Sequence, residues 1–166
     1  MQKIIALPLI LALSGCGAGS NDDFSGDKLS NGYPDIGGKY SIRLSDIAGT
    51  CSDGSNLTVA SLSTNFTVSQ DGNVLEIIIE KSEPSGLVLE VVSETDYRGT
   101  VFKDGTFVVT REATYILEGI GSTYYKFTLD GEFKINTWSG DVDMNVINVK
   151  YGFSCNGKGD FKGDKL

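Results

Sequence analysis

Residues 66–79 read FTVSQDGNVLEIII, and this stretch decides the fold class. Apolar residues alternate with polar ones up to the Asp-Gly pair at 71–72, which favours a two-residue hairpin turn. Such a turn places Val68 opposite Leu75, so the apolar side chains share one face of an antiparallel pair. The stretch therefore predicts a β-hairpin with one buried face.

The same alternation continues further along the chain. Leu89 and Val91 extend it after a turn at 83–86, and Phe102 faces Phe107 across a second Asp-Gly pair. These segments carry no helical period. We therefore expect more antiparallel strands joined by short turns.

A third Asp-Gly pair, at 130–131, does not fit a hairpin, because a two-residue turn there would mix apolar and charged side chains on one face. We predict instead one long strand over residues 123–138, bent at Gly131. A turn at 139–140 then follows.

This register predicts which of the following side chains point into the barrel and which point outward. It points Ile135 inward and Trp138 outward, where Trp138 and Tyr124 would form an exposed aromatic patch. The apolar phase reverses after Val146, which implies a β-bulge.

About eight antiparallel strands in meander order result, so the fold class is all-β. An up-and-down β-barrel is the expected architecture, and a two-sheet β-sandwich is the alternative. The predicted strands cover residues 39–46, 57–69, 73–81, 86–93, 97–103, 106–117, 123–138 and 141–155.

This layout resembles the lipocalin-like (calycin) barrels in architecture, although the chain has no Gly-x-Trp signature near its first strand. The resemblance implies an interior that either fills with side chains or holds one small molecule. The expected interior is apolar and is lined by Leu75, Ile77, Leu89, Val91, Phe107, Val109, Tyr115, Phe127, Phe133 and Ile135.

The first three residues include one lysine, Lys3. An apolar run of ten residues follows at 4–13 and leads into the tetrad Leu13-Ser14-Gly15-Cys16. The run is too short to cross a bilayer as a permanent helix, but it suits an export signal. The tetrad resembles the lipobox of bacterial lipoproteins. That resemblance implies cleavage before Cys16, acylation of this residue and stable anchoring in a bilayer through several acyl chains. The alternative is an ordinary signal peptide with a chance cysteine.

We expect four segments along the chain. Residues 1–15 form the signal peptide, 16–38 the lipidated N-terminus and a flexible tether rich in Gly, Ser, Asn and Asp, 39–156 the β-barrel, and 157–166 a polar C-terminal tail. Glycine follows the lipidated cysteine, a pattern similar to that of enteric lipoproteins sent to the outer membrane. The expected location is therefore the bacterial cell envelope, with the lipid in the outer membrane.

Two further cysteines remain, Cys51 and Cys155. In an exported chain, two remaining thiols suggest a disulfide. Cys51 follows the first predicted strand and Cys155 ends the last, so the bond requires these strands to be neighbours, as in a closed barrel. The alternative is two free buried thiols.

The composition excludes several functions. With 14 Lys+Arg against 22 Asp+Glu, the formal net charge is −8, and no basic cluster suits nucleic-acid phosphates. The absence of histidine excludes a Ser-His-Asp relay and imidazole metal ligands. Residues 141–145 begin like a calcium loop but lack the later glycine and glutamate. We expect no metal, no cofactor and no catalytic residue.

Arg111 is the most informative charged residue. It shares the inward phase of Phe107 and Tyr115, where an unpaired charge is very costly, so it must pair, sit at a barrel mouth or meet a ligand. Arg98 falls on the same face by the predicted register. The candidate ligand-binding residues are therefore Arg111, Tyr115, Phe107 and Phe127.

Two functions fit these features. The first is a membrane-anchored envelope lipoprotein whose non-catalytic barrel binds a small apolar ligand. The second is a filled barrel that docks another envelope protein through its outer surface, as a structural or assembly component. A cavity of about 300 Å³ or more, open at one end, would favour the ligand.

Overall fold

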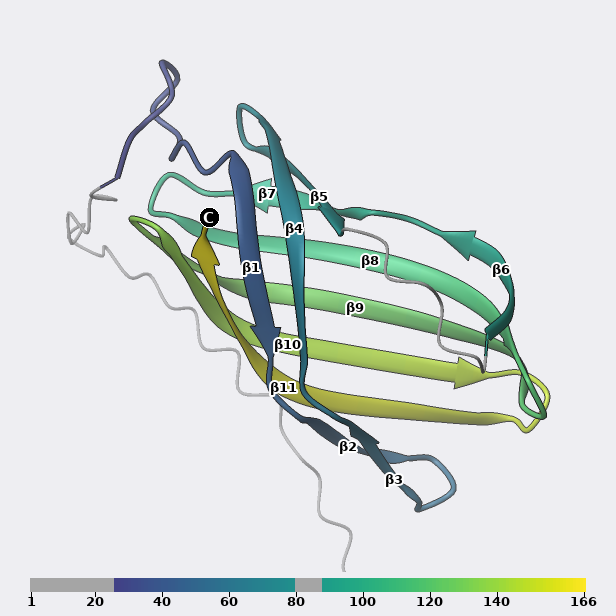
Figure 1. Cartoon of the computed structure of the whole chain (residues 1–166). Helices are drawn as coiled ribbons and strands as arrows, with labels where there is room; N and C mark the ends of the chain where they lie inside the picture. Colours follow the sequence, from purple (N-terminus) through teal and green to yellow (C-terminus); the bar gives the residue numbers. More distant parts are fainter. Residues whose placement is uncertain (1–25, 80–87) are drawn as a thin grey trace, which may run out of the picture.

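The computed structural model describes residues 26–79 and 88–166, and every regular element in these ranges is a β-strand (Figure 1). No helix in the described ranges is long and apolar enough to span a membrane. The eleven strands are β1 (Gly38–Leu44), β2 (Ile47–Cys51), β3 (Asn56–Val59), β4 (Leu62–Asp71), β5 (Val74–Ile79), β6 (Val88–Glu94), β7 (Tyr97–Val101), β8 (Thr106–Leu117), β9 (Gly121–Lys134), β10 (Thr137–Asn148) and β11 (Phe153–Lys165).

Eight of these strands form a closed antiparallel barrel. Its order is β1-β4-β5-β7-β8-β9-β10-β11, and β11 closes the ring by pairing with β1. Strands β2, β3 and β6 add to the sheet outside this ring. The predicted all-β fold and the barrel are therefore confirmed.

The barrel has two different halves. In the closed half, β4 pairs with β5, and the ring is complete. In the other half, β2 replaces β1 as the neighbour of β11, and β6 replaces β7 as the neighbour of β8. Among the described residues, β3 and β6 do not pair with each other, so the sheet is open here. We call this part the splayed half; β2, β3 and β6 mark it in Figure 1.

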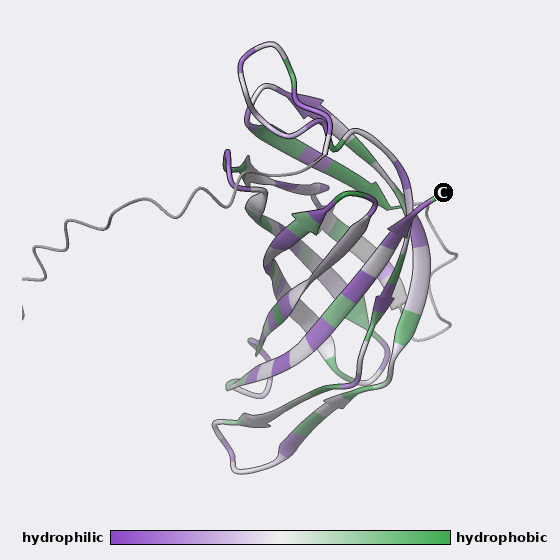
Figure 2. Ribbon diagram, turned by 90° about the vertical axis from the view of Figure 1, so that its left-hand side faces the viewer, coloured by the Kyte–Doolittle hydropathy of each residue, from purple (hydrophilic) through white to green (hydrophobic). Residues whose placement is uncertain are grey.

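The closed half is filled by aromatic side chains around Trp138, which is only 1% exposed. The ring centroids of Tyr40, Phe66, Phe107 and Phe133 lie 4.7–5.2 Å from that of Trp138. At these separations, aromatic pairs stabilise beyond the area that they bury. The alternation of apolar and polar residues along the strands, which sends one set of side chains inward, is visible in Figure 2.

The buried position of Trp138 corrects the predicted long strand. Strand β9 ends at Lys134, a two-residue turn follows at 135–136, and Trp138 pairs with Phe133. The predicted turn at 139–140 lies inside β10 instead. The new register turns Trp138 inward and leaves Ile135 exposed, so neither the inward Ile135 nor the Tyr124–Trp138 surface patch exists.

Two other hairpins form where predicted but in a different register. Val68 pairs with Ile77 rather than Leu75, because the turn uses residues 72–73 instead of 71–72. All three side chains remain buried, since the shift preserves the face. Near the second Asp-Gly pair the register shift does change the face. Phe107 pairs with Val101 rather than with the predicted Phe102, so Phe102 points outward.

The predicted polar tail at 157–166 is also wrong. Residues up to Lys165 belong to β11, which pairs with β10 from Phe153 to Asp164. Two of its four buried positions are glycine, and a Cβ atom on Gly157 would lie 2.8 Å from Ile47 Cγ2. Glycine suits this position because the Ile47 side chain of the paired strand β2 lies so close.

The end of β10 corrects the predicted bulge. The strand stops at Asn148, whose side chain is fully buried and donates to Thr123 Oγ1 at 2.8 Å. A turn at 149–152 then leads into β11. No bulge follows Val146, because β10 keeps an unbroken register with β9 and β11 up to Asn148.

Part of the expected tether is attached to the barrel. Ile36 is fully buried in the core, its carbonyl accepts a hydrogen bond from Tyr40 Oη at 2.9 Å, and Gln70 Nε2 donates to the Pro34 carbonyl. The predicted signal peptide, Cys16 and the predicted turn at 83–86 lie outside the described residues, as do the side chains of Leu89 and Val91.

Candidate functional site

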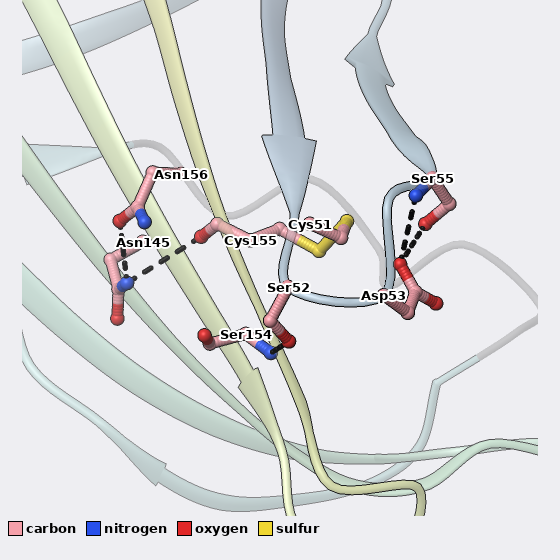
Figure 3. The surroundings of a disulfide bond; sticks show 8 residues. All are labelled: Cys51, Ser52, Asp53, Ser55, Asn145, Ser154, Cys155 and Asn156. Atoms are coloured by element: carbon pink, nitrogen blue, oxygen red, sulfur yellow. Dashed lines mark hydrogen bonds between the residues drawn. A yellow bond between two sulfur atoms is a disulfide. The ribbon is translucent and has the colours of Figure 1, made fainter. Parts of the chain in front are cut away.

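The predicted disulfide joins Cys51 and Cys155 across neighbouring strands (Figure 3). The two residues are directly paired in the register of β2 and β11, and they are 104 positions apart in the sequence. Because β2 belongs to the splayed half, the bond fixes one edge of that half to the barrel. The prediction of a disulfide between first and last parts of the barrel is confirmed.

Hydrogen bonds hold the loop beside the disulfide (Figure 3). Ser154 N donates to Ser52 Oγ at 3.1 Å, and Ser55 donates to Asp53 from both its hydroxyl and its backbone N–H. The bonds from Ser55 lower the pKa of the Asp53 carboxyl below its ordinary value. The β2–β3 hairpin is therefore a defined edge of the splayed half.

Arg111 points inward, as expected, and its charge is paired. Its guanidinium forms an ion pair with Glu94, and its side chain is 19% exposed. It also donates to the Thr95 carbonyl at 3.2 Å and stacks over the Tyr97 ring, 5.8 Å from the centroid. Of the three roles considered for Arg111, the structure shows pairing.

One expected inward charge is absent from this site. Arg98 was expected on the inward face but lies outside, where its guanidinium donates to Glu76 at 2.6 Å and 2.9 Å. The shifted β7–β8 register explains Arg98, since Arg98 pairs with Thr110.

Three half-buried aromatic residues line the inner face of the splayed half. The ring centroid of Tyr125 lies 5.7 Å from that of Tyr115 and 6.3 Å from that of Phe127. Burial raises the pKa of the Tyr125 phenol. Tyr115, Tyr125 and Phe127 are called the aromatic wall below. Arg111 pairs in register with Phe127 and donates to Tyr115 Oη, so the ion pair borders the wall.

The structure therefore brings together three of the four candidate ligand residues. Arg111, Tyr115 and Phe127 lie in the splayed half, whereas Phe107 is fully buried against Trp138 in the closed half. Tyr125 was not among the candidates. Its position two residues before Phe127 in a strand places both on one face, and this signal was present in the sequence.

A shallow groove of about 630 Å³ crosses the outer face of β9, β10, β11 and β2. Polar side chains border it: Asn145 Nδ2 donates to Asn156 Oδ1 at 2.9 Å, and Lys158 forms an ion pair with Asp143 at 3.1 Å. Its floor includes Gly49 and Gly157. The groove can accept and donate hydrogen bonds through these side chains.

No protein-family model matches the chain, and no curated protein resembles it closely enough to assign a family. The candidate site therefore rests on geometry: an aromatic wall in the splayed half of a barrel, bordered by a paired arginine and braced by a disulfide.

Proposed function

We propose that this protein is a bacterial envelope lipoprotein, anchored through an acylated Cys16, whose barrel is a non-catalytic binding module. The module binds a small apolar ligand on the aromatic wall of the splayed half. The observation that carries this proposal is the half-buried state of three neighbouring rings on an inward face. The Leu-Ser-Gly-Cys tetrad supports the anchor and, with the glycine after it, placement in the outer membrane.

The packing of the two halves decides where the ligand lies. Aromatic side chains fill the closed half, so an apolar molecule has no room beside Trp138. The wall still exposes apolar surface, and covering it stabilises a complex by roughly 25 cal/mol per Å². Since Glu94 already neutralises Arg111, the border offers hydrogen bonds without net charge. A neutral ligand therefore suits the site better than a free anion.

A lipophilic fluorescent dye tests the binding site. We expect it to bind the wild-type protein and to lose about tenfold or more in affinity when Tyr125→Ser and Phe127→Ser remove two rings, because tenfold is only 1.4 kcal/mol. Tyr124→Ser on the same strand is the matched control, since Tyr124 has the opposite phase. If the dye does not bind, and native mass spectrometry of the purified protein finds no small molecule, the ligand proposal is wrong.

Replacement of Cys16 tests the anchor. The Cys16→Ala variant should lack the acyl mass at its N-terminus and leave the membrane fraction, because the anchoring acyl chains are gone. Wild-type partitioning of this variant would contradict the proposed anchor.

Docking of another envelope protein through the outer surface is the second candidate, and the groove across β9, β10, β11 and β2 favours it. Lys158→Glu reverses the charge of one groove side chain and should abolish capture of such a partner while dye binding is unchanged. Capture that depends on the aromatic wall instead would contradict docking at this groove.

A further inference from the structure

The turns at one end of the closed half form a continuous rim. Val101 N donates to the Asn73 carbonyl at 2.9 Å, and Phe133 N donates to the Gly105 carbonyl at 2.8 Å. These bonds join the β4–β5, β7–β8 and β9–β10 turns. Lys165 N donates to the Asn136 carbonyl and brings the end of β11 to the same place.

The segment that leads to the proposed lipid anchor joins this rim. Asp35 N donates to the Asp27 carbonyl at 2.7 Å, and Gln70 holds the segment against β4. The ammonium of Lys103, in the β7–β8 turn, lies 5.5 Å from the centroid of the Tyr33 ring. The chain therefore approaches the barrel at this end, which we call the tether-side rim.

A large apolar side chain is exposed in or directly beside each of the three turns in the tether-side rim. Ile135 is 62% exposed, Phe102 is 49% exposed, and Val74 is more than half exposed. Exposed apolar residues that gather on successive turns, rather than singly, mark an interaction surface.

The backbone of Ile135 makes this exposure more informative. Its φ is 53°, the left-handed region that glycine and asparagine favour and that is unfavourable for a β-branched residue. It is the only non-glycine residue with positive φ in residues 26–79 and 88–166. A strained apolar residue at an exposed tip gains nothing from packing in the barrel, so the strain points to a contact outside it.

We propose that the tether-side rim docks on the phospholipid bilayer that carries the anchor, with Phe102, Ile135 and Val74 inserted at the interface. The inference rests on the proposed acylation of Cys16. It adds an orientation: the closed half faces the membrane, and the splayed half with its aromatic wall faces away.

Chain length favours this orientation. Gly26 lies ten positions after Cys16, so the anchor lies at most about 35 Å from the start of the described chain. Strand β9 has 14 residues and is about 45 Å long, which gives a barrel height of about 35 Å at a strand tilt of about 40°. The tether-side rim can therefore rest on the membrane with a relaxed tether, whereas the opposite end, where Val149 and Tyr151 are exposed, would need the tether fully extended.

Charge predicts which bilayers suit the rim. Lysines and acids alternate around it, as in Lys103 beside Asp104 and Lys134 near Glu132, so the rim is not strongly basic. Docking should therefore depend on apolar insertion and only weakly on anionic lipid.

Quenching by bromine-labelled lipid acyl chains tests the orientation. The full acylated chain is reconstituted in phosphatidylcholine vesicles with a new tryptophan at the rim (Phe102→Trp) or, as matched control, at the opposite end (Val149→Trp). The native Trp138 is buried and gives the same background in both variants. Apolar side chains at an interface lie about 5–10 Å into the headgroup boundary. We therefore expect several-fold stronger quenching at position 102 than at 149.

Each outcome decides a separate point. Quenching at position 102 that weakens when Ile135→Asn is added supports the inference, and unchanged quenching overturns the part assigned to Ile135. An acylated protein that floats with the vesicles but shows equal or no quenching at the two positions overturns the docking alone. Absence of the acyl mass at residue 16 overturns the anchor and the docking together. Quenching that requires phosphatidylglycerol overturns apolar insertion as the cause.

Discussion

The two halves of the barrel use similar residues for different purposes. In the closed half, Trp138 and Phe107 are fully enclosed by neighbouring rings. In the splayed half, Tyr125 and Phe127 lie on equally continuous strands, yet they remain half-buried because β3 and β6 do not meet in the described structure. This difference shows that strand pairing, rather than the aromatic residues themselves, determines whether the rings pack in a core or form a partly exposed wall.

Substitution of the central ring should have the largest effect. Trp138→Ala removes a fully buried side chain from the closed half and should lower the free energy of unfolding by about 3–5 kcal/mol. Phe127→Ala in the splayed half should lose roughly half as much, because its ring is half-buried. Urea denaturation followed by circular dichroism measures both. Equal losses would show that the two halves are packed alike.

Removal of the disulfide should come next. A double Cys51→Ala, Cys155→Ala variant removes the cross-link between residues 104 positions apart. It should lose about 2–4 kcal/mol of stability, because the unfolded chain is no longer constrained by that loop. Because the bond joins β2 to β11, hydrogen exchange should accelerate first in the β2–β3 hairpin of the splayed half. Wild-type protein treated with a reductant is the control. Uniform acceleration in both halves would contradict a local role.

Alkaline pH should destabilise the barrel through its buried phenols. Burial raises the pKa of Tyr97 and Tyr40 above the ordinary value of 10.0, with smaller contributions from Tyr115 and the negative charge of Asp35 respectively. A raised folded-state pKa stabilises the fold below pH 10, and this stabilisation is lost as the pH rises further.

By pH 11 each of these two phenols should lower the stability by on the order of 1 kcal/mol. Tyrosinate absorbance recorded during denaturation at several pH values measures the effect. The Tyr97→Phe variant is the control and should lose less stability than the wild type over this range. Free ionisation of both phenols in the folded protein near pH 10 would contradict their burial.

The smallest effect on stability should come from the polar border of the splayed half. Arg111→Met with Glu94→Gln removes a partly exposed ion pair, and such pairs contribute about 0–1 kcal/mol. Dye affinity at the aromatic wall should change while the unfolding midpoint hardly moves. A loss of several kcal/mol would show that the pair belongs to the core rather than to the surface.

The sequence predicted the barrel because period-two alternation survives small errors in register. Val68 and Ile77 share a face whether the turn uses residues 71–72 or 72–73. The predicted disulfide was correct because both cysteines lie near strands that neighbour in space, although the pairing that joins them is β2 with β11 rather than the closure of β1 with β11.

The predictions of strand boundaries failed at two kinds of position: a residue with an unusual backbone conformation for its type, and glycines that have no side chain. The turn at Ile135 was missed because an isoleucine with φ of 53° carries no turn signal. Strand β11 was missed because glycine occupies most of its inward positions after Cys155, and the single inward Phe161 is too little to reveal the alternation. The splay, which creates the candidate site, follows from where pairing stops, and local alternation carries no information on that point.

Strand β11 also sets the order in which the molecule can assemble. It is the shared neighbour of β1, β2 and β10, so the first strands have no partner on that side until residues 153–165 have been synthesised. Contacts so distant in sequence form slowly, because a long loop must close first. The ring therefore stays open until its last strand arrives, and under the proposed export this delay would suit a chain that threads through a narrow channel before it folds.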